Sequence, residues 1–189
     1  MPFTLFHYPF GYWLSKIDRK LVLPALLVGS VIPDIEVPIL FFFFSGIVTD
    51  HFILHSLIGS LTIGLVLAVL TTRYVYPTLI SRLFRLPKNE LDELCGVTPN
   101  LIVSCAIGIL FHLIADYPIH WYNHLLWPWV DPFLLVGPLA ILVSSILSTD
   151  IVTGYLISGT ISGVVLGVSL IYIAIRNRDG LWRRMWIGN

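Results

Sequence analysis

The sequence predicts an all-α protein, a polytopic bundle of membrane helices with four to five apolar segments. Charged residues make up 12% of its 189 residues, against roughly 25% in an average soluble domain. The mean hydropathy is +0.88, so lipid must cover apolar surface that a soluble fold of this size has no room to bury. Several stretches also approach the about 20 apolar residues that a membrane span needs. We therefore expect one integral membrane domain over residues 1–189.

Four apolar stretches follow one another along the chain: Leu21–Val48, Phe52–Thr72, Leu101–Ile119 and Pro132–Ile175. Pro33 and Pro38 interrupt the first stretch, whereas the second is uninterrupted. Pro118 should kink or end the third helix, because proline lacks the amide donor and clashes with the preceding turn. The last stretch is long enough for two helices, with a break near Ser148–Asp150.

Two polar segments are expected at the membrane surfaces, a loop at Tyr74–Pro99 and a C-terminal tail at 176–189. The tail mixes Arg with Trp, which is typical of an interfacial anchor. Both segments are basic, so both should lie in the cytoplasm, yet three full spans between them would place them on opposite sides. We therefore expect one apolar segment to be re-entrant or half-length, and Leu134–Ser148 is the shortest.

The remaining composition constrains partners rather than chemistry. The formal net charge is zero, so the total charge suggests no nucleic-acid partner. Cys95 and Cys105 are interpreted as packing residues. The first basic residue is Lys16, so the charged leading segment of a cleavable signal peptide is missing. Gly159, Gly163 and Gly167 share one helix face, which would allow close helix packing or an oligomer; the alternative is that glycine is simply common in membrane helices.

Ionisable residues inside apolar stretches are costly and mark function by default. His112 and Asp116 are four residues apart, so they share a helix face and suit a metal site. His51 and His55 repeat that spacing, and the pattern continues past Pro118 to two further histidines. The other candidates are His7 in an aromatic N-terminal segment, Asp34 and Glu36 at the break in the first stretch, and His120 and His124 after Pro118.

Each candidate also has a simpler interpretation. A single membrane histidine is usually a hydrogen-bonded helix contact. The pair of His112 and Asp116 would then be a salt bridge, and Asp34 with Glu36 would lie in a water-exposed loop. However, His55 begins one span and Asp116 ends the next, so antiparallel neighbours would bring them to the same side of the membrane. We therefore expect a shared site on the side opposite the Tyr74–Pro99 loop.

Four short motifs occur in an order that resembles a known family. They are His7, PDIE at Pro33–Glu36, HSL at His55–Leu57 and HLIAD at His112–Asp116. This pattern, over about residues 1 to 130, resembles the membrane-bound metal-dependent hydrolases first noted as LexA-regulated, which are distantly similar to zinc-dependent phospholipase C. The opening MPFTLFH also resembles a related family of uncharacterised membrane proteins.

The resemblance implies a divalent metal, with zinc favoured and manganese or iron as alternatives. Its ligands would be His7, Asp34, His55, His112 and Asp116. The chain departs from the family at Glu36, where Asp is frequent, and at His51, which lies four rather than five residues before His55. A second H-x-x-x-D/E helix is missing from the sequence, so one or two metals are expected rather than three.

The resulting prediction is a metal-dependent hydrolase that cleaves a phosphoester of a membrane lipid or other amphiphile with a metal-activated water. The general base or orienting groups would be Glu36, His120 or His124. The aromatic stretch Trp121–Trp129 would lie at the membrane interface, with the extracytoplasmic face favoured. The alternatives are a transporter, in which the buried ionisable groups form a permeation path, and a structural protein with a closed metal site.

Overall fold

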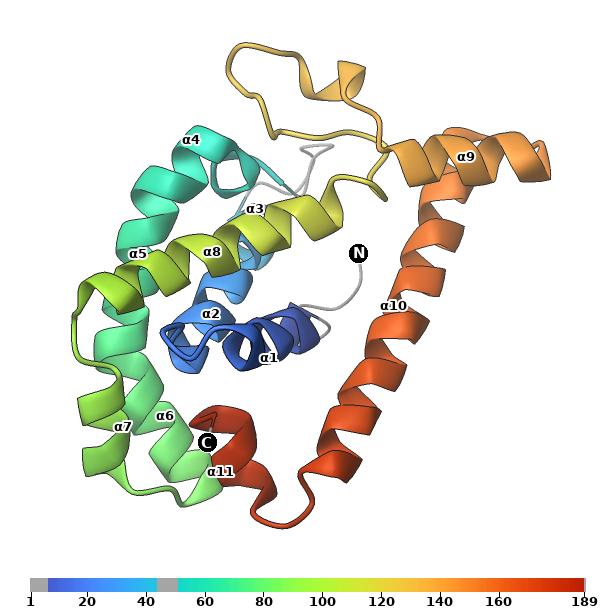
Figure 1. Ribbon diagram of the computed structural model, residues 1–189. Coiled ribbons are helices and arrows are strands. Elements are labelled where there is room, and N and C mark those ends of the chain that lie inside the picture. Colours follow the sequence, from blue (N-terminus) through green and yellow to red (C-terminus); the bar gives the residue numbers. More distant parts are fainter. Residues whose placement is uncertain (1–6, 44–50, 189) are drawn as a thin grey trace.

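The computed structural model describes residues 7–43 and 51–188, and these residues form helices and loops with no strand (Figure 1). The α-helices are α1 (Tyr8–Ile17), α2 (Leu23–Val31), α3 (Glu36–Phe43), α4 (Leu57–Gly59), α5 (Leu65–Leu70), α6 (Tyr76–Phe84), α7 (Lys88–Leu94), α8 (Pro99–Asp116), α9 (Pro138–Leu147), α10 (Ile151–Arg176) and α11 (Leu181–Trp186). The 3-10 and π-helical segments are η2 (Pro33–Ile35), η3 (Ile53–His55), η4 (Ser60–Gly64), η5 (Thr71–Val75) and η6 (Pro132–Leu134).

Four continuous helical rods are long and apolar enough to cross a membrane. They are Leu23–Phe43, Leu57–Phe84, Pro99–Asp116 and Ile151–Arg176. The first joins α2, η2 and α3, the second runs from α4 to α6, and the last two are α8 and α10. The predicted all-α membrane bundle is therefore confirmed. The end of the first predicted stretch, from residue 44 to Val48, lies outside the described residues.

The second rod is longer than the sequence pattern suggested. The expectation of a loop beginning at Tyr74 is wrong, because α6 continues the helix to Phe84. Tyr76 and Ile80, one turn apart, are buried, whereas Arg82 is exposed. This amphipathic continuation carries charge on its outer face, which made it resemble a loop in sequence. Arg85 ends the helix with a left-handed backbone at φ 55°.

Helix α9 has only 10 residues and is too short to span a membrane. It ends at Ser148, whose φ of 52° is left-handed, so the break expected near Ser148–Asp150 is confirmed. Between the loop after α6 and the C-terminal tail, all of it described by the structure, only α8 and α10 are long and apolar enough to cross a membrane. Two crossings return the chain to its starting side, and Figure 1 shows α7 and α11 together at the end of the molecule away from α9. The conflict in the basic-residue pattern is thereby removed.

Helices α2 and α8 cross at two glycines. A Cβ atom added to Gly29 would lie 2.3 Å from the Cys105 carbonyl oxygen, and one added to Gly108 would lie 2.3 Å from the Leu26 carbonyl oxygen. Only glycine permits so close a backbone contact. Asp34 follows Gly29 by five residues and His112 follows Gly108 by four, so the crossing fixes the relative positions of both.

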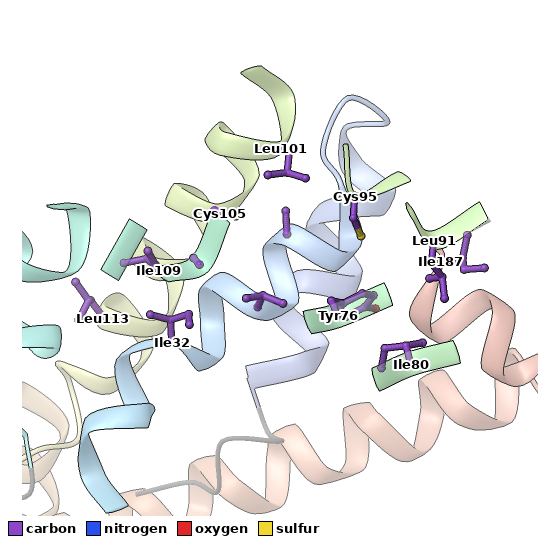
Figure 2. Close-up of a cluster of buried hydrophobic side chains, with 13 residues drawn as sticks. Ile32, Tyr76, Ile80, Leu91, Cys95, Leu101, Cys105, Ile109, Leu113 and Ile187 are labelled. Carbon is purple, nitrogen blue, oxygen red and sulfur yellow. The ribbon is translucent and has the colours of Figure 1, made fainter. Parts of the chain in front are cut away.

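The main apolar core lies between α2, α6, α7 and α8 (Figure 2). Both cysteines are free and lie within it, as the packing interpretation predicted. Burial raises the pKa of the Cys95 thiol to about 12, so this thiol is unreactive at neutral pH. Leu113, at one edge of this core in Figure 2, is the neighbour of His112, so the core ends where the polar cluster begins.

Helix α10 has the most exposed apolar surface of the four rods, with only 17% of its most apolar window buried. Lipid must cover the rest. Gly159 is buried, whereas Gly163 and Gly167 are partly exposed, and an oligomer through this face stays a prediction. The tail beyond α10 is less peripheral than expected, because Met185 and Ile187 are buried against the bundle.

Candidate metal centre

All six histidines of the chain are buried. They gather with three buried carboxylates near the end of α8, the start of the Leu57–Phe84 rod and the middle of the Leu23–Phe43 rod. Asp34 lies in η2, Glu36 begins α3, and His55 ends η3 just before α4. His112 and Asp116 lie in the last two turns of α8, which ends before Pro118 as proline chemistry predicts. The remaining members are His7 at the start of α1, His51 before η3, and His120 and His124 in the segment after α8.

Four of the five predicted ligands form one compact group. Asp34, His55, His112 and Asp116 each present a donor atom within 4.8 Å of the others. His112 Nε2 lies 3.3 Å from His55 Nε2, 3.4 Å from Asp116 Oδ2 and 3.5 Å from Asp34 Oδ1. Two ligand atoms bound tetrahedrally at about 2.0 to 2.1 Å from zinc lie about 3.3 Å apart. The three spacings from His112 therefore match those around one divalent ion, whereas His55 Nε2 lies farther from Asp34 Oδ1 and Asp116 Oδ2, at 3.7 and 4.0 Å.

The imidazole tautomers at this group are fixed by their other ring nitrogens. His112 Nδ1 donates to the Ser30 carbonyl at 2.8 Å, and His55 Nδ1 donates to Glu36 Oε1 at 2.7 Å. Because neither acceptor carries a proton, each imidazole must hold a proton on Nδ1, which leaves Nε2 as the ring nitrogen that faces inward. Two lone pairs at 3.3 Å repel each other unless a cation or a proton lies between them. Metal-binding histidines are oriented in this way.

Glu36 is committed to orienting its neighbours. Its Oε1 accepts from the Phe52 amide at 2.6 Å as well as from His55, and its Oε2 accepts from the Leu54 amide at 2.8 Å. Both carboxylate oxygens are thus engaged, which favours the orienting role over that of general base. The alternative of a water-exposed loop is wrong, since Asp34 and Glu36 are only 6% and 8% exposed.

The carboxylates around His55 favour its positively charged form. Burial alone would lower its pKa, but hydrogen bonds with Asp34 and Glu36 and the negative charges of Glu36 and Asp116 raise it to about 9. In the metal-free protein His55 is therefore positively charged at neutral pH, with a proton on both ring nitrogens. Metal binding must displace that proton, because only the neutral ring nitrogen is a ligand.

A second group of donors shares Asp116 with the first. His51, Asp116 and His120 also present donor atoms within 4.8 Å of one another, and all three are buried. His120 Nδ1 donates to the Asp116 carbonyl at 2.8 Å, while its buried Nε2 has no hydrogen-bond partner among the described residues. Burial and the nearby His51 lower the pKa of His120 to about 3, so the ring is neutral. His51 was not among the predicted ligands, although it lies four residues before His55.

Two predicted residues lie beside these groups rather than within them. The His7 ring lies 4.3 Å from that of His112, and His7 Nε2 is 3.7 Å from Asp116 Oδ1. Its role as a ligand stays a prediction. His124 packs against Phe52 and Tyr122 and lines a cavity of about 20 Å³, which has room for about one water molecule. Its role as a general base also stays a prediction.

Comparison with known proteins identifies a family but no characterised relative. No curated protein and no solved structure matches the chain. The family model described as YdjM inner membrane protein matches residues 5–183, which includes every residue of the two donor groups. That description agrees with the four apolar rods and with the membrane location expected from the sequence. The chain belongs to the YdjM inner membrane protein family.

Proposed function

We propose that the protein is a membrane-embedded metal-dependent hydrolase that cleaves a phosphoester of a lipid or another amphiphile. The observation that carries the proposal is the convergence of His55 Nε2 and His112 Nε2 on two carboxylates, with each Nδ1 anchored by an acceptor. Because both Nδ1 atoms donate elsewhere, the two Nε2 atoms face each other at 3.3 Å and need a cation or a proton between them.

The residues fit a divalent ion of the zinc, manganese or iron type, because imidazole and carboxylate donors suit these metals. Asp34, His55, His112 and Asp116 would hold it. Such an ion, when bound, polarises a phosphoryl oxygen and lowers the pKa of a bound water toward 7. Glu36 and the Ser30 carbonyl keep the two imidazoles in their binding tautomers. His120 and His124, both on the cavity wall, are the remaining candidates for the general base.

The placement of the donors favours an enzyme over a transporter. The donors lie close together, where α8 ends, the Leu57–Phe84 rod begins and the Leu23–Phe43 rod passes from η2 to α3. A permeation path would distribute ionisable groups along the depth of the membrane. The motif order resembles that of membrane-bound metal-dependent hydrolases, which are distantly similar to zinc-dependent phospholipase C, and this favours a phosphoester as the substrate.

The orientation of the protein supports an amphiphile on the extracytoplasmic side. All 11 Lys and Arg residues lie in three segments, 16–20, 73–88 and 176–184. The structure gathers these segments at the end of the bundle away from the donors, where α7 and α11 lie (Figure 1). Basic residues flanking spans stay in the cytoplasm. The donor groups then face outward, beside Phe52 and Trp127, whose rings pack at 5.2 Å, as aromatic side chains do at a lipid interface.

The test combines metal removal with loss of one ligand. Purified protein in mixed micelles is expected to release phosphate or a head group from at least one phospholipid in a panel when zinc is present. His112→Ala should reduce that release by more than about 100-fold, because it removes the ligand that lies within 3.5 Å of three other donors. Arg178→Ala, an exposed change far from the donors, is the matched control and should retain activity.

Two outcomes would contradict the proposal. Release that persists in His112→Ala after exhaustive chelation would show that the metal group is not responsible. A panel of phosphoesters with no turnover by zinc-loaded protein would favour the transporter instead.

A further inference from the structure

The sharing of Asp116 between two donor groups points to more than one metal. His112, at i−4 on the same helix, directs its Nε2 to Asp116 Oδ2 at 3.4 Å. The segment after α8 then turns back, so that His120 Nδ1 donates to the Asp116 carbonyl. A carboxylate has two oxygens with about four lone-pair sites, so one side chain can serve two ions.

The second group has its own orienting contacts. His120 Nδ1 is fixed by the Asp116 carbonyl at 2.8 Å, which leaves Nε2 as the ligand atom. This Nε2 is fully buried and has no hydrogen-bond partner among residues 7–43 and 51–188. The His51 ring packs edge-on against His55 at 3.9 Å and against His120 at 4.8 Å, and the Tyr122 hydroxyl lies 3.4 Å from His51 Nδ1. A buried nitrogen left without a partner is costly unless an unseen ligand satisfies it.

Charge balance requires a second cation if the substrate is anionic. Asp34, Glu36 and Asp116 are three buried carboxylates, and residues 21–72 and 89–175, which hold every donor of the two groups, contain no Lys or Arg. A single ion of charge +2 against three carboxylates leaves the centre at −1, which would repel a phosphoester. Two such ions bring it to +1, which would attract one.

We infer that His51, Asp116 and His120 form a second metal subsite, joined to the first through the shared Asp116 carboxylate. This inference rests on the proposed function for its substrate charge, but not for its geometry. It assigns ligand roles to His120, otherwise a candidate base, and to His51. Two-metal sites with ions about 3.5 to 4 Å apart are common in enzymes that cleave phosphoesters, where they hold the attacking and leaving oxygens.

The experiment counts metal rather than turnover. Protein stripped with a chelator and dialysed against excess zinc is expected to hold two zinc ions per chain by elemental analysis. His120→Asn should hold one, because the Asn amide can still donate to the Asp116 carbonyl but no longer supplies Nε2. His51→Ala should also hold one. His124→Asn is the matched control, another buried histidine of the same segment outside both groups, and should retain two.

Zinc X-ray absorption gives a second readout. Scattering between two metals about 3.5 to 4 Å apart should appear in the zinc-loaded wild type and vanish in His120→Asn. Size-exclusion profiles and thermal melts in detergent identify any variant that fails to fold. If one of His51→Ala and His120→Asn fails, the zinc content of the other tests the second subsite.

One zinc per chain in the wild type, or two retained in both His51→Ala and His120→Asn, would overturn the second subsite. Loss of a zinc from His124→Asn with none lost from His120→Asn would show that His120 was wrongly assigned as the ligand. Two zinc ions with no phosphoester turnover would support the subsite while counting against the proposed function. One zinc with turnover would do the reverse.

Discussion

The two ends of the bundle differ in which charges they carry and in how deeply they bury them. At one end, here called the donor end (Asp34–Glu36, His51–His55 and His112–His124), every histidine and carboxylate of the two donor groups is buried. At the other, the basic end (Lys16–Lys20, Arg73–Lys88 and Arg176–Arg184), the cations are mostly exposed. Exposed cations at a membrane surface are stable without partners, whereas buried acids and imidazoles need a compensating charge.

The contacts at the basic end are surface ion pairs and hydrogen bonds. Arg183 forms an ion pair with Glu90 of α7, and Lys16 Nζ donates to the Gly188 carbonyl at 2.8 Å. These contacts link α11 to α7 and α1 across the surface. Ionisable groups can therefore anchor a protein at one end and form a candidate metal centre at the other, depending on whether they are exposed or buried.

The largest expected contrast between the ends is in accessibility from outside. Cys95 and Cys105 are completely buried, so a thiol reagent should label only a single cysteine that is introduced at the surface. In right-side-out membrane vesicles, Leu134→Cys near the donor end should react with a membrane-impermeant maleimide, because Leu134 is 76% exposed. Val97→Cys, between α7 and α8 and 57% exposed, should react only after permeabilisation. The reverse labelling pattern would place the donor groups in the cytoplasm.

A smaller effect is expected when an orienting group is changed. Glu36→Gln keeps the shape of the side chain but removes the charge that holds His55 and the Phe52 and Leu54 amides. Zinc affinity, measured by competition with a chromophoric chelator, should fall about 10- to 100-fold. Glu90→Gln at the basic end is the matched control and should leave zinc affinity unchanged. Equal affinity in wild type and Glu36→Gln would refute the orienting role.

How far the sequence could predict these features depends on the range of the interactions involved. The pairing of His112 with Asp116 follows from helical spacing, and the end of α8 follows from Pro118, because both are local effects. The break after α9 was likewise visible at Ser148–Asp150. These elements needed no tertiary information.

Other features depend on contacts between distant segments. Glu36 is hydrogen-bonded because the backbone amides of Phe52 and Leu54, 16 and 18 residues further along the chain, donate to its carboxylate. No local sequence pattern reveals these bonds. The membership of His51 in a donor group depends on the turn that brings His120 back to Asp116. The length of the second rod was missed because an amphipathic helix end at a membrane surface has the composition of a loop.

The close crossing of α2 and α8 also went unrecognised, since Gly29 and Gly108 are isolated glycines without a repeated spacing. Gly108→Ala tests its contribution to the donor end. Its Cβ would lie 2.3 Å from the Leu26 carbonyl oxygen, so the helices must separate, at a cost of about 1 to 3 kcal/mol. The thermal midpoint in detergent should fall, and zinc affinity should fall a few-fold as Asp34 moves relative to His112. Gly64→Ala is the control, since its Cβ would meet no atom closer than 3.6 Å; equal losses in both variants would contradict the argument.

The smallest effect is expected at the basic end itself. Arg183→Ala removes an ion pair with Glu90 in which the Arg183 side chain is 48% exposed and that of Glu90 is 29% exposed. Exposed pairs contribute about 0 to 1 kcal/mol, because water and salt screen the charges and the long side chains lose entropy when held together. The thermal midpoint in detergent should therefore shift little, and zinc stoichiometry and phosphoester release should equal those of the wild type. A loss of bound zinc in Arg183→Ala would show that the two ends are coupled through α7 and α8, and the separation of anchoring from chemistry would then be wrong.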